Sequence, residues 1–172
     1  MTTRLSGFCS QADEDQGETN ALRHSHEPPI VAGVDESSAS AAALDTAVGL
    51  ADELDAPVVF VYVRRGPAGF LGEPVYQRRL GAEMTRAREV LDQALKVAAG
   101  AGVEAEGVIL EGSPERRIAE IARDRGARLV VVGSRRYKFG RGVSSAVVRS
   151  AGRPVVVAAR GVHAVAAVRP AA

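Results

Sequence analysis

The chain has few of the residues that mark secreted, membrane-spanning or nucleic-acid-binding proteins. It contains no tryptophan and only 4% aromatic residues, so its core must be built mainly from Ala, Val, Leu and Ile. The single cysteine, Cys9, has no partner for an internal disulfide, which favours a reducing compartment. No apolar run approaches the roughly 20 residues that a membrane-spanning helix needs, and the start of the chain lacks a signal-peptide pattern. We therefore expect a cytoplasmic protein without a membrane partner.

A bias toward one sign of charge is also missing, since 22 Lys and Arg residues are balanced by 21 Asp and Glu residues. This balance argues against a bulk nucleic-acid binder. The 172 residues, 46% of them hydrophobic, fit one domain with tails. We expect a disordered polar tail over residues 1–28, one domain over residues 29–160 and a C-terminal tail over residues 161–172. His24 and His26 lack the third ligand that a metal site needs, so no metal site is predicted.

Between the tails, apolar runs alternate with segments of helical periodicity. The runs are short and continuous, which is typical of buried parallel strands, whereas the other segments place Ala and Leu on one face. Strands are expected at 30–34, 57–63, 103–110, 129–132 and 154–158, with helices at 37–54, 75–101, 113–125 and 144–150. Ser37 or Ser38 is a plausible N-cap of the first helix, and Ser113 with Pro114 is a natural start for the third.

This strict alternation predicts an α/β fold, a three-layer αβα sandwich with helices on both faces of a parallel sheet. Five strands favour the flavodoxin-like order 3-2-1-4-5, which has a switch point between the first and fourth strands. Ligands of such sheets bind at the carboxyl ends of the strands around this point. Asp35 follows the first strand and Gly133-Ser134 follows the fourth, so we expect these residues to converge.

The stretch from Leu129 to Val157 predicts an anion pocket. A buried strand leads into Gly133-Ser134, then into a basic loop that contains glycine, then into a short helix whose N–H groups can face a phosphate. Two interpretations of the loop remain open. Its cations, Arg135, Arg136, Lys138 and Arg141, either grip phosphates or form a solvated basic loop.

Residues 30–160 resemble a universal stress protein domain. The resemblance rests on the order and spacing of VAGVDESSAS, VVFVYV, EGSPERRIAEIA, LVVVGSR and VVRSAGRPVVVA. It implies an adenine nucleotide alpha hydrolase-like sandwich that binds ATP or a related nucleotide, with or without Mg²⁺, in a stress-response role. It also implies a homodimer that forms through the last strand, Pro154 to Ala158.

The resemblance further implies which residues hold the nucleotide. ATP-binding members carry the pattern G-x2-G-x9-G-[S/T] after the fourth strand. Gly33, Val34 and Asp35 would then face the adenosine, and Val63 would present its backbone to the adenine. The phosphate loop would open at Val132, Gly133, Ser134 and Arg135 and close at Gly142, Val143 and Ser144.

The loop departs from this pattern. The second motif glycine falls on Arg136 and the third would fall on Ala146, while Pro154 arrives early, so the loop is shorter than in the pattern. Gly140 and Gly142 are the nearest substitutes for the closing glycine. A side chain at Arg136 blocks the close backbone approach that glycine allows. Either the arginines compensate for the missing glycines, or the loop cannot wrap a triphosphate.

Asp35 has several possible roles, namely a nucleotide contact, a metal ligand, a phosphoacceptor or a cap on the following helix. The phosphoacceptor role is rejected, because the third strand ends in Glu111 and no lysine follows the fifth strand, unlike in receiver domains. The expected ordered region has no histidine and no cysteine nucleophile, so we expect a non-enzyme with at most weak ATP hydrolysis.

The sequence therefore predicts a dimeric, nucleotide-regulated stress protein. Nucleotide binding would order the loop from Arg135 to Ser144 and change the surface offered to an unidentified protein partner. The alternative is a nucleotide-free protein-interaction module with a vestigial pocket.

Overall fold

The computed structural model describes residues 27–64, 73–134 and 142–159. Strands and helices alternate along these residues, as predicted. The elements in chain order are β1 (Ile30–Gly33), α2 (Ser38–Leu54), β2 (Val58–Arg64), α3 (Glu73–Gly100), β3 (Ala105–Glu111), α4 (Pro114–Asp124), β4 (Leu129–Gly133), α5 (Val143–Ser150) and β5 (Val155–Ala158). The tails and the loop cations Arg135, Arg136, Lys138 and Arg141 lie outside the described residues, as do Cys9, His24 and His26.

The five strands form one parallel sheet in the order β3-β2-β1-β4-β5, which confirms the predicted topology. β1 lies in the middle, and its last residue, Gly33, is in register with Val61 of β2 and Val132 of β4. The carboxyl ends of these three strands therefore meet at one edge. This is the edge where the sequence places the switch point.

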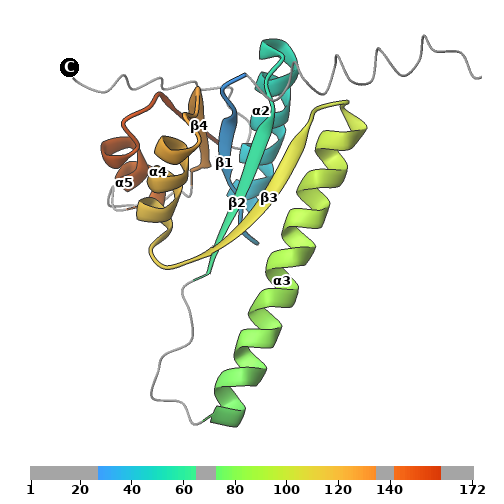
Figure 1. Ribbon diagram of the computed structural model, residues 1–172, viewed down its shortest axis with the longest axis vertical. Coiled ribbons are helices and arrows are strands. Elements are labelled where there is room, and N and C mark those ends of the chain that lie inside the picture. The colour runs from blue at the N-terminus through green and yellow to red at the C-terminus, as the bar shows by residue number, and fades with distance from the viewer. Residues whose placement is uncertain (1–26, 65–72, 135–141, 160–172) are drawn as a thin grey trace, which may run out of the picture.

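The core consists of two layers, one on each face of the sheet, because successive strand residues point to opposite faces. Ile30, Val58 and Phe60 belong to the layer under α2 and α3, where Ala43 and Ala47 of α2 are fully buried. A second layer lies under α4 and α5 and is built from Val31, Val59, Val130, Val132, Ile118 and Val147. Figure 1 shows the two helix pairs on the two sides of the sheet.

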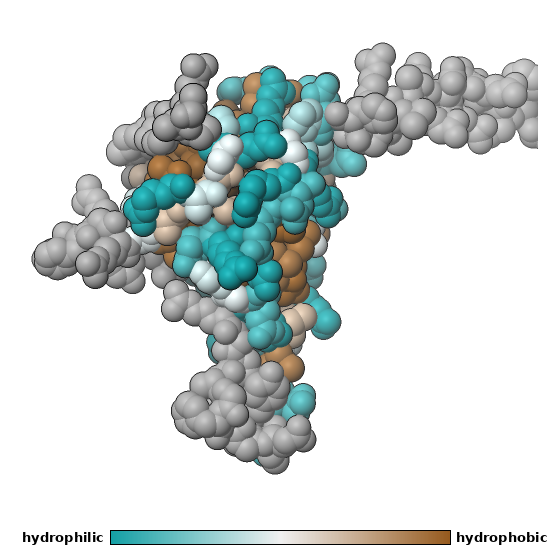
Figure 2. All heavy atoms as spheres, turned by 60° about the vertical axis from the view of Figure 1, so that its left-hand side comes forward, coloured by the Kyte–Doolittle hydropathy of each residue, from teal (hydrophilic) through white to brown (hydrophobic). Residues whose placement is uncertain are grey.

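The outer surface on the α4 and α5 side is mostly hydrophilic, with small apolar areas between the polar ones (Figure 2). Arg116, Arg117 and Arg123 of α4 are exposed there, while Ile118 and Ala122 of the same helix are buried. α4 is thus strongly amphipathic. No helix in the described part of the chain has the length and hydropathy needed to cross a membrane.

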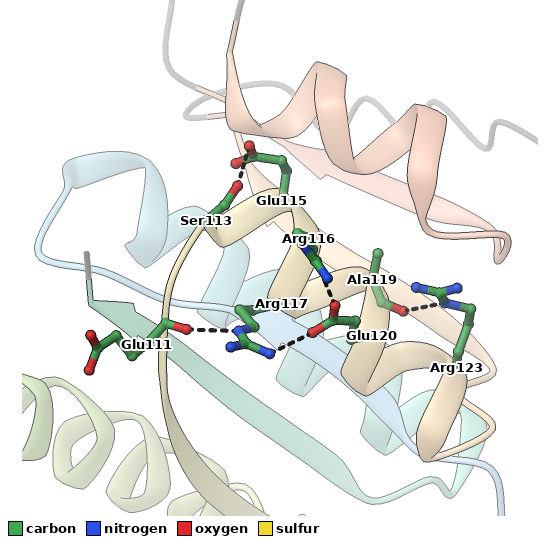
Figure 3. Close-up of polar contacts among 8 residues, drawn as sticks. All are labelled: Glu111, Ser113, Glu115, Arg116, Arg117, Ala119, Glu120 and Arg123. Carbon is green, nitrogen blue, oxygen red and sulfur yellow. Dashed lines mark hydrogen bonds and ion pairs between the residues drawn. The ribbon is translucent and has the colours of Figure 1, made fainter. Parts of the chain in front are cut away.

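The helix starts differ in detail from the sequence prediction. Ser37 and Ser113 occupy N-cap positions, yet neither side chain makes the capping hydrogen bond that serine usually supplies. The hydroxyl of Ser37 donates to Oδ1 of Asp35, and that of Ser113 donates to Glu115 (Figure 3). A nearby carboxylate acceptor therefore replaces the backbone N–H as the partner of each serine.

Candidate functional site

A cavity of about 470 Å³ opens at the carboxyl edge of the sheet, where β1, β2 and β4 end. Nine of the residues predicted to bind a ligand line it together: Gly33, Val34, Asp35, Val63, Val132, Gly133, Gly142, Val143 and Ser144. The predicted convergence of Asp35 and Gly133 is therefore confirmed. We call this cavity the carboxyl-edge pocket.

The remaining predicted residues are placed elsewhere or not described. Ser134 does not line the pocket; its N–H donates to the carbonyl oxygen of Ala158 at 2.7 Å and so extends the pairing of β4 with β5. Arg135, Arg136 and Gly140 lie outside the described residues. How the basic loop meets the pocket thus stays a prediction.

Sequence reasoning missed five lining residues: Ser37, Ser40, Val61, Pro114 and Ile118. Pro114 and Ile118 belong to α4, which leads from β3 at one sheet edge back to β4, next to the central strand. A right-handed crossover of this kind carries the start of the helix over the switch point. The topology could have indicated their position, but neither residue type signals a binding site.

Three helices point their N-terminal ends at the pocket. Its lining includes Ser37 and Ser40 at the start of α2, Pro114 at the start of α4 and Gly142 at the start of α5. At all three N-caps, no side chain makes a capping hydrogen bond. Helix N-termini carry partial positive charge, so three of them together favour an anion in this cavity.

Asp35 is held in a tight turn before α2. Its Oδ1 accepts hydrogen bonds from the Ser37 N–H at 2.8 Å and from the Ser37 hydroxyl, and its own N–H donates to the Ser40 hydroxyl at 2.9 Å. Asp35 is nevertheless exposed, so its carboxylate both shapes the turn and borders the pocket. The cap role and the ligand role considered for this residue are therefore compatible.

The two glycines at the strand ends serve different purposes. A Cβ atom on Gly33 would lie 2.8 Å from Cδ1 of Ile118, the flexible end of a pocket-lining side chain. A Cβ atom on Gly133 would lie 2.6 Å from the carbonyl carbon of Ala39 in α2, and closer still to its oxygen. Gly133 is thus required for packing α2 on β4, whatever ligand the pocket holds.

The other side of this edge, facing α3, is acidic. The pKa of Tyr62 is raised by burial and by the negative charges of Glu36, Asp35 and Glu83, while Arg86 opposes the shift. Arg86 also pairs with Glu36, with 4.0 Å between Nε and Oε1. Tyr62 packs against the core, so it stays protonated and structural at neutral pH.

A second cavity, of about 500 Å³, lies at the opposite, amino edge of the sheet. Its lining includes Pro29, Pro57, Glu104, Glu106 and Arg125. Nη1 of Arg125 lies 2.6 Å from Oε1 of Glu106 there, so these two charges already pair with each other. Ligands of open parallel sheets bind at the carboxyl edge, so we assign the candidate site to the carboxyl-edge pocket despite its slightly smaller volume.

Comparison with known proteins identifies the family. The model of the universal stress protein family matches residues 28–159, and this chain therefore belongs to that family. Universal stress protein YxiE of Bacillus subtilis (strain 168) is similar, with 30% identity over 115 residues, which are 62% of this chain and 78% of the relative.

Solved structures share the fold. A universal stress protein family member from Burkholderia pseudomallei has 27% identity and a TM-score of 0.64, over 75% of this chain and 93% of the other. The universal stress protein from Archaeoglobus fulgidus, solved in complex with dAMP, has 25% identity and a TM-score of 0.61, over 76% of this chain and 97% of the other.

Proposed function

We propose that this chain binds an adenine nucleotide in the carboxyl-edge pocket as a regulatory ligand. The observation that carries this proposal is the meeting of three uncapped helix N-termini around one cavity at the switch point of the sheet. Such a site attracts a phosphate group. The dAMP held by the Archaeoglobus fulgidus relative supports a nucleotide as the source of that phosphate.

The two ends of the pocket suit the two ends of a nucleotide. Gly142 and Ser144, at the start of α5, form the end where backbone N–H groups can receive the phosphate. Asp35 and Val63 border the other end, where a carboxylate can accept hydrogen bonds from ribose hydroxyls and a strand end offers backbone groups to a base. Gly33 and Val132 also line the pocket.

The preferred nucleotide depends on the number of phosphates that the protein can hold. A monophosphate needs only the helix ends that line the described pocket, whereas ATP also needs partners for two further phosphates. The cations at Arg135, Arg136, Lys138 and Arg141 are the candidates for this task. Among the residues lining the pocket, Asp35 is the one carboxylate that can hold Mg²⁺.

Calorimetric titration of the purified protein with Mg-ATP, AMP and a cyclic nucleotide tests the proposal. Micromolar binding of one of them supports a nucleotide-regulated protein. The absence of heat, together with an unchanged melting temperature, contradicts the proposal and favours a nucleotide-free interaction module. One feature suits that second candidate: the large hydrophobic side chain of Val143, which lines the pocket, is 38% exposed.

Asp35→Asn is expected to weaken nucleotide affinity by about tenfold, the effect of losing charge-assisted hydrogen bonds to the ribose. The asparagine keeps an Oδ1 acceptor for the Ser37 N–H, so the turn before α2 is preserved. Asp45→Asn is the matched control, because Asp45 is exposed on α2 and does not line the pocket. Equal affinities for the two variants would remove Asp35 from the site.

We also propose that two copies of the chain associate through β5. This strand is one edge of the sheet and carries Val155, Val156 and Val157. The other edge strand, β3, contains Glu106 and is directly preceded by Glu104. An apolar edge invites pairing, and a charged edge resists it. Light scattering is expected to give twice the 18.0 kDa of one chain. The mass of a single chain at all micromolar concentrations would contradict this.

The regulatory role proposed here does not require catalysis. Phosphoryl transfer to water needs a positioned metal and a residue that orients the attacking water. Asp35 is the one acidic residue in the described lining, and no histidine lies in the described residues. We propose at most weak ATP hydrolysis, and phosphate release that depends on Asp35 would reveal it.

A further inference from the structure

The turn between β3 and α4 is held from both sides by arginines. It consists of Glu111, Gly112 and Ser113, and we call it the β3–α4 turn. Arg64, the last residue of β2, pairs with the Glu111 carboxylate through its guanidinium, and its carbonyl oxygen accepts the Gly112 N–H at 2.9 Å. The Arg64 side chain is only 16% exposed, and its Nη1 lies 3.9 Å from Oε2 of Glu83 in α3.

Arg117 holds the same turn from the α4 side. Its Nε donates to the Glu111 carbonyl oxygen at 2.7 Å, and its Nη1 donates to Glu120 at 2.9 Å. Arg116 donates to the same carboxylate at 2.8 Å, and these two hydrogen bonds lower the pKa of Glu120. Figure 3 shows Arg117 directed at the Glu111 carbonyl, while the Glu111 carboxylate points away from it.

Gly112 makes this double contact possible. Its φ of +131° lies in a region that side chains rarely adopt, and a Cβ atom there would lie 3.2 Å from Nε of Arg117. Gly112 thus lies where the Arg117 side chain approaches the turn and where the Arg64 carbonyl oxygen accepts the N–H of the turn.

Each of these contacts adjoins a residue of the pocket wall. Val63 precedes Arg64, Pro114 follows the turn, and Ile118 follows Arg117, and all three line the carboxyl-edge pocket. Arg64 and Arg117 themselves do not line it. Along a strand, neighbouring side chains point to opposite faces, so Arg64 secures the backbone of β2 from the face opposite to Val63.

We propose that Arg64 and Arg117 are positioning residues that fix Val63, Pro114 and Ile118 in one wall of the carboxyl-edge pocket. This inference rests on the proposed nucleotide site. A wall fixed before the ligand arrives lowers the ordering cost of binding, so affinity falls when the wall is loosened.

The test compares Arg64→Met and Arg117→Met with Arg125→Met. Arg125 is the matched control, because it also pairs with a glutamate of β3, but at the amino edge of the sheet. Arg117 is 45% exposed, so its variant is expected to fold even if Arg64→Met does not. The protein is the full chain, and the ligand is AMP.

Both test variants are expected to weaken AMP binding by about tenfold, because a loosened wall must be ordered when the nucleotide binds. Arg64→Lys is expected to restore part of the affinity, since it keeps the charge but not the forked geometry. A loss no greater than in Arg125→Met would overturn the proposal.

A second measurement needs no ligand. Hydrogen exchange followed by NMR is expected to be faster at the Gly112 amide in Arg64→Met and Arg117→Met, and unchanged in Arg125→Met. Unchanged exchange at Gly112 in both test variants would overturn the proposal. If the wild-type protein binds no nucleotide, the proposed function fails, while this measurement still decides whether the arginines hold the wall.

Discussion

Gly133→Val is expected to unfold the domain or to lower its free energy of unfolding by more than about 3 kcal/mol, at the upper end for overpacked sites. The added Cβ would lie 2.6 Å from the backbone carbonyl carbon of Ala39 and 3.0 Å from its Cβ. Because the Ala39 carbonyl group belongs to the backbone, no change of side-chain rotamer can relieve the clash. The first turn of α2 would have to move away from β4, so the packing of Ala39 and its neighbours in α2 against the sheet would be lost. Urea denaturation followed by circular dichroism measures the change.

Gly49→Ala is the control for this prediction. Gly49 lies in the interior of α2, and a Cβ atom added there meets nothing within 4 Å. Alanine is the better helix former, so this variant is expected to gain about 0.5–1 kcal/mol. A Gly133→Val protein with wild-type stability would show that α2 can move freely against β4. The expected instability also means that nucleotide affinity cannot be tested by substitution at Gly133.

Phe60→Ala is expected to lower the free energy of unfolding by about 3–5 kcal/mol, the usual cost of emptying a buried phenylalanine site. Phe60 is fully buried in the middle of β2, and it belongs to the core layer under α2 and α3. This core has few aromatic residues, so the neighbouring alanines and valines have little volume with which to fill the space. Chemical denaturation of the purified variant measures the loss.

Phe60→Leu separates cavity formation from the loss of an aromatic ring. Leucine fills most of the site, so its cost is expected to stay below about 1.5 kcal/mol, as for other substitutions of similar volume. A Phe60→Ala variant that loses less than 1 kcal/mol would mean that the helices collapse onto the gap. Both Phe60 variants are expected to leave the carboxyl-edge pocket in place if the domain folds, because Phe60 does not line it.

Much of the fold could be predicted from the sequence because the hydrophobic pattern is continuous in the strands and periodic in the helices. Five strands in strict alternation with helices favoured the flavodoxin-like strand order, and the structure has the same order. Asp35 and Gly133 could be placed at one pocket because both follow strands that adjoin the switch point. The boundaries differ in detail from the prediction: β3 begins at Ala105 and not at Val103.

The rest of the site could not be predicted, because it depends on contacts between distant segments. Ile118 looks like any buried residue of an amphipathic helix, and only the path of α4 over β1 and β2 brings it to Gly33. Arg64 and Arg117 look like ordinary surface charges, and the β3–α4 turn that joins them appears only after β2 and β3 are paired. Ser37 was predicted as a cap, but its hydroxyl binds Asp35.

The sequence by itself determined the class of fold, the order of the strands and the edge at which the carboxyl-edge pocket lies. These features depend on local patterns of apolar residues and on general rules of chain connection. Only the tertiary structure decided which side chains form the pocket wall, why Gly133 must be glycine, and how two arginines hold one turn. These features depend on atoms brought within a few ångströms by packing, and no pattern along the chain records such distances.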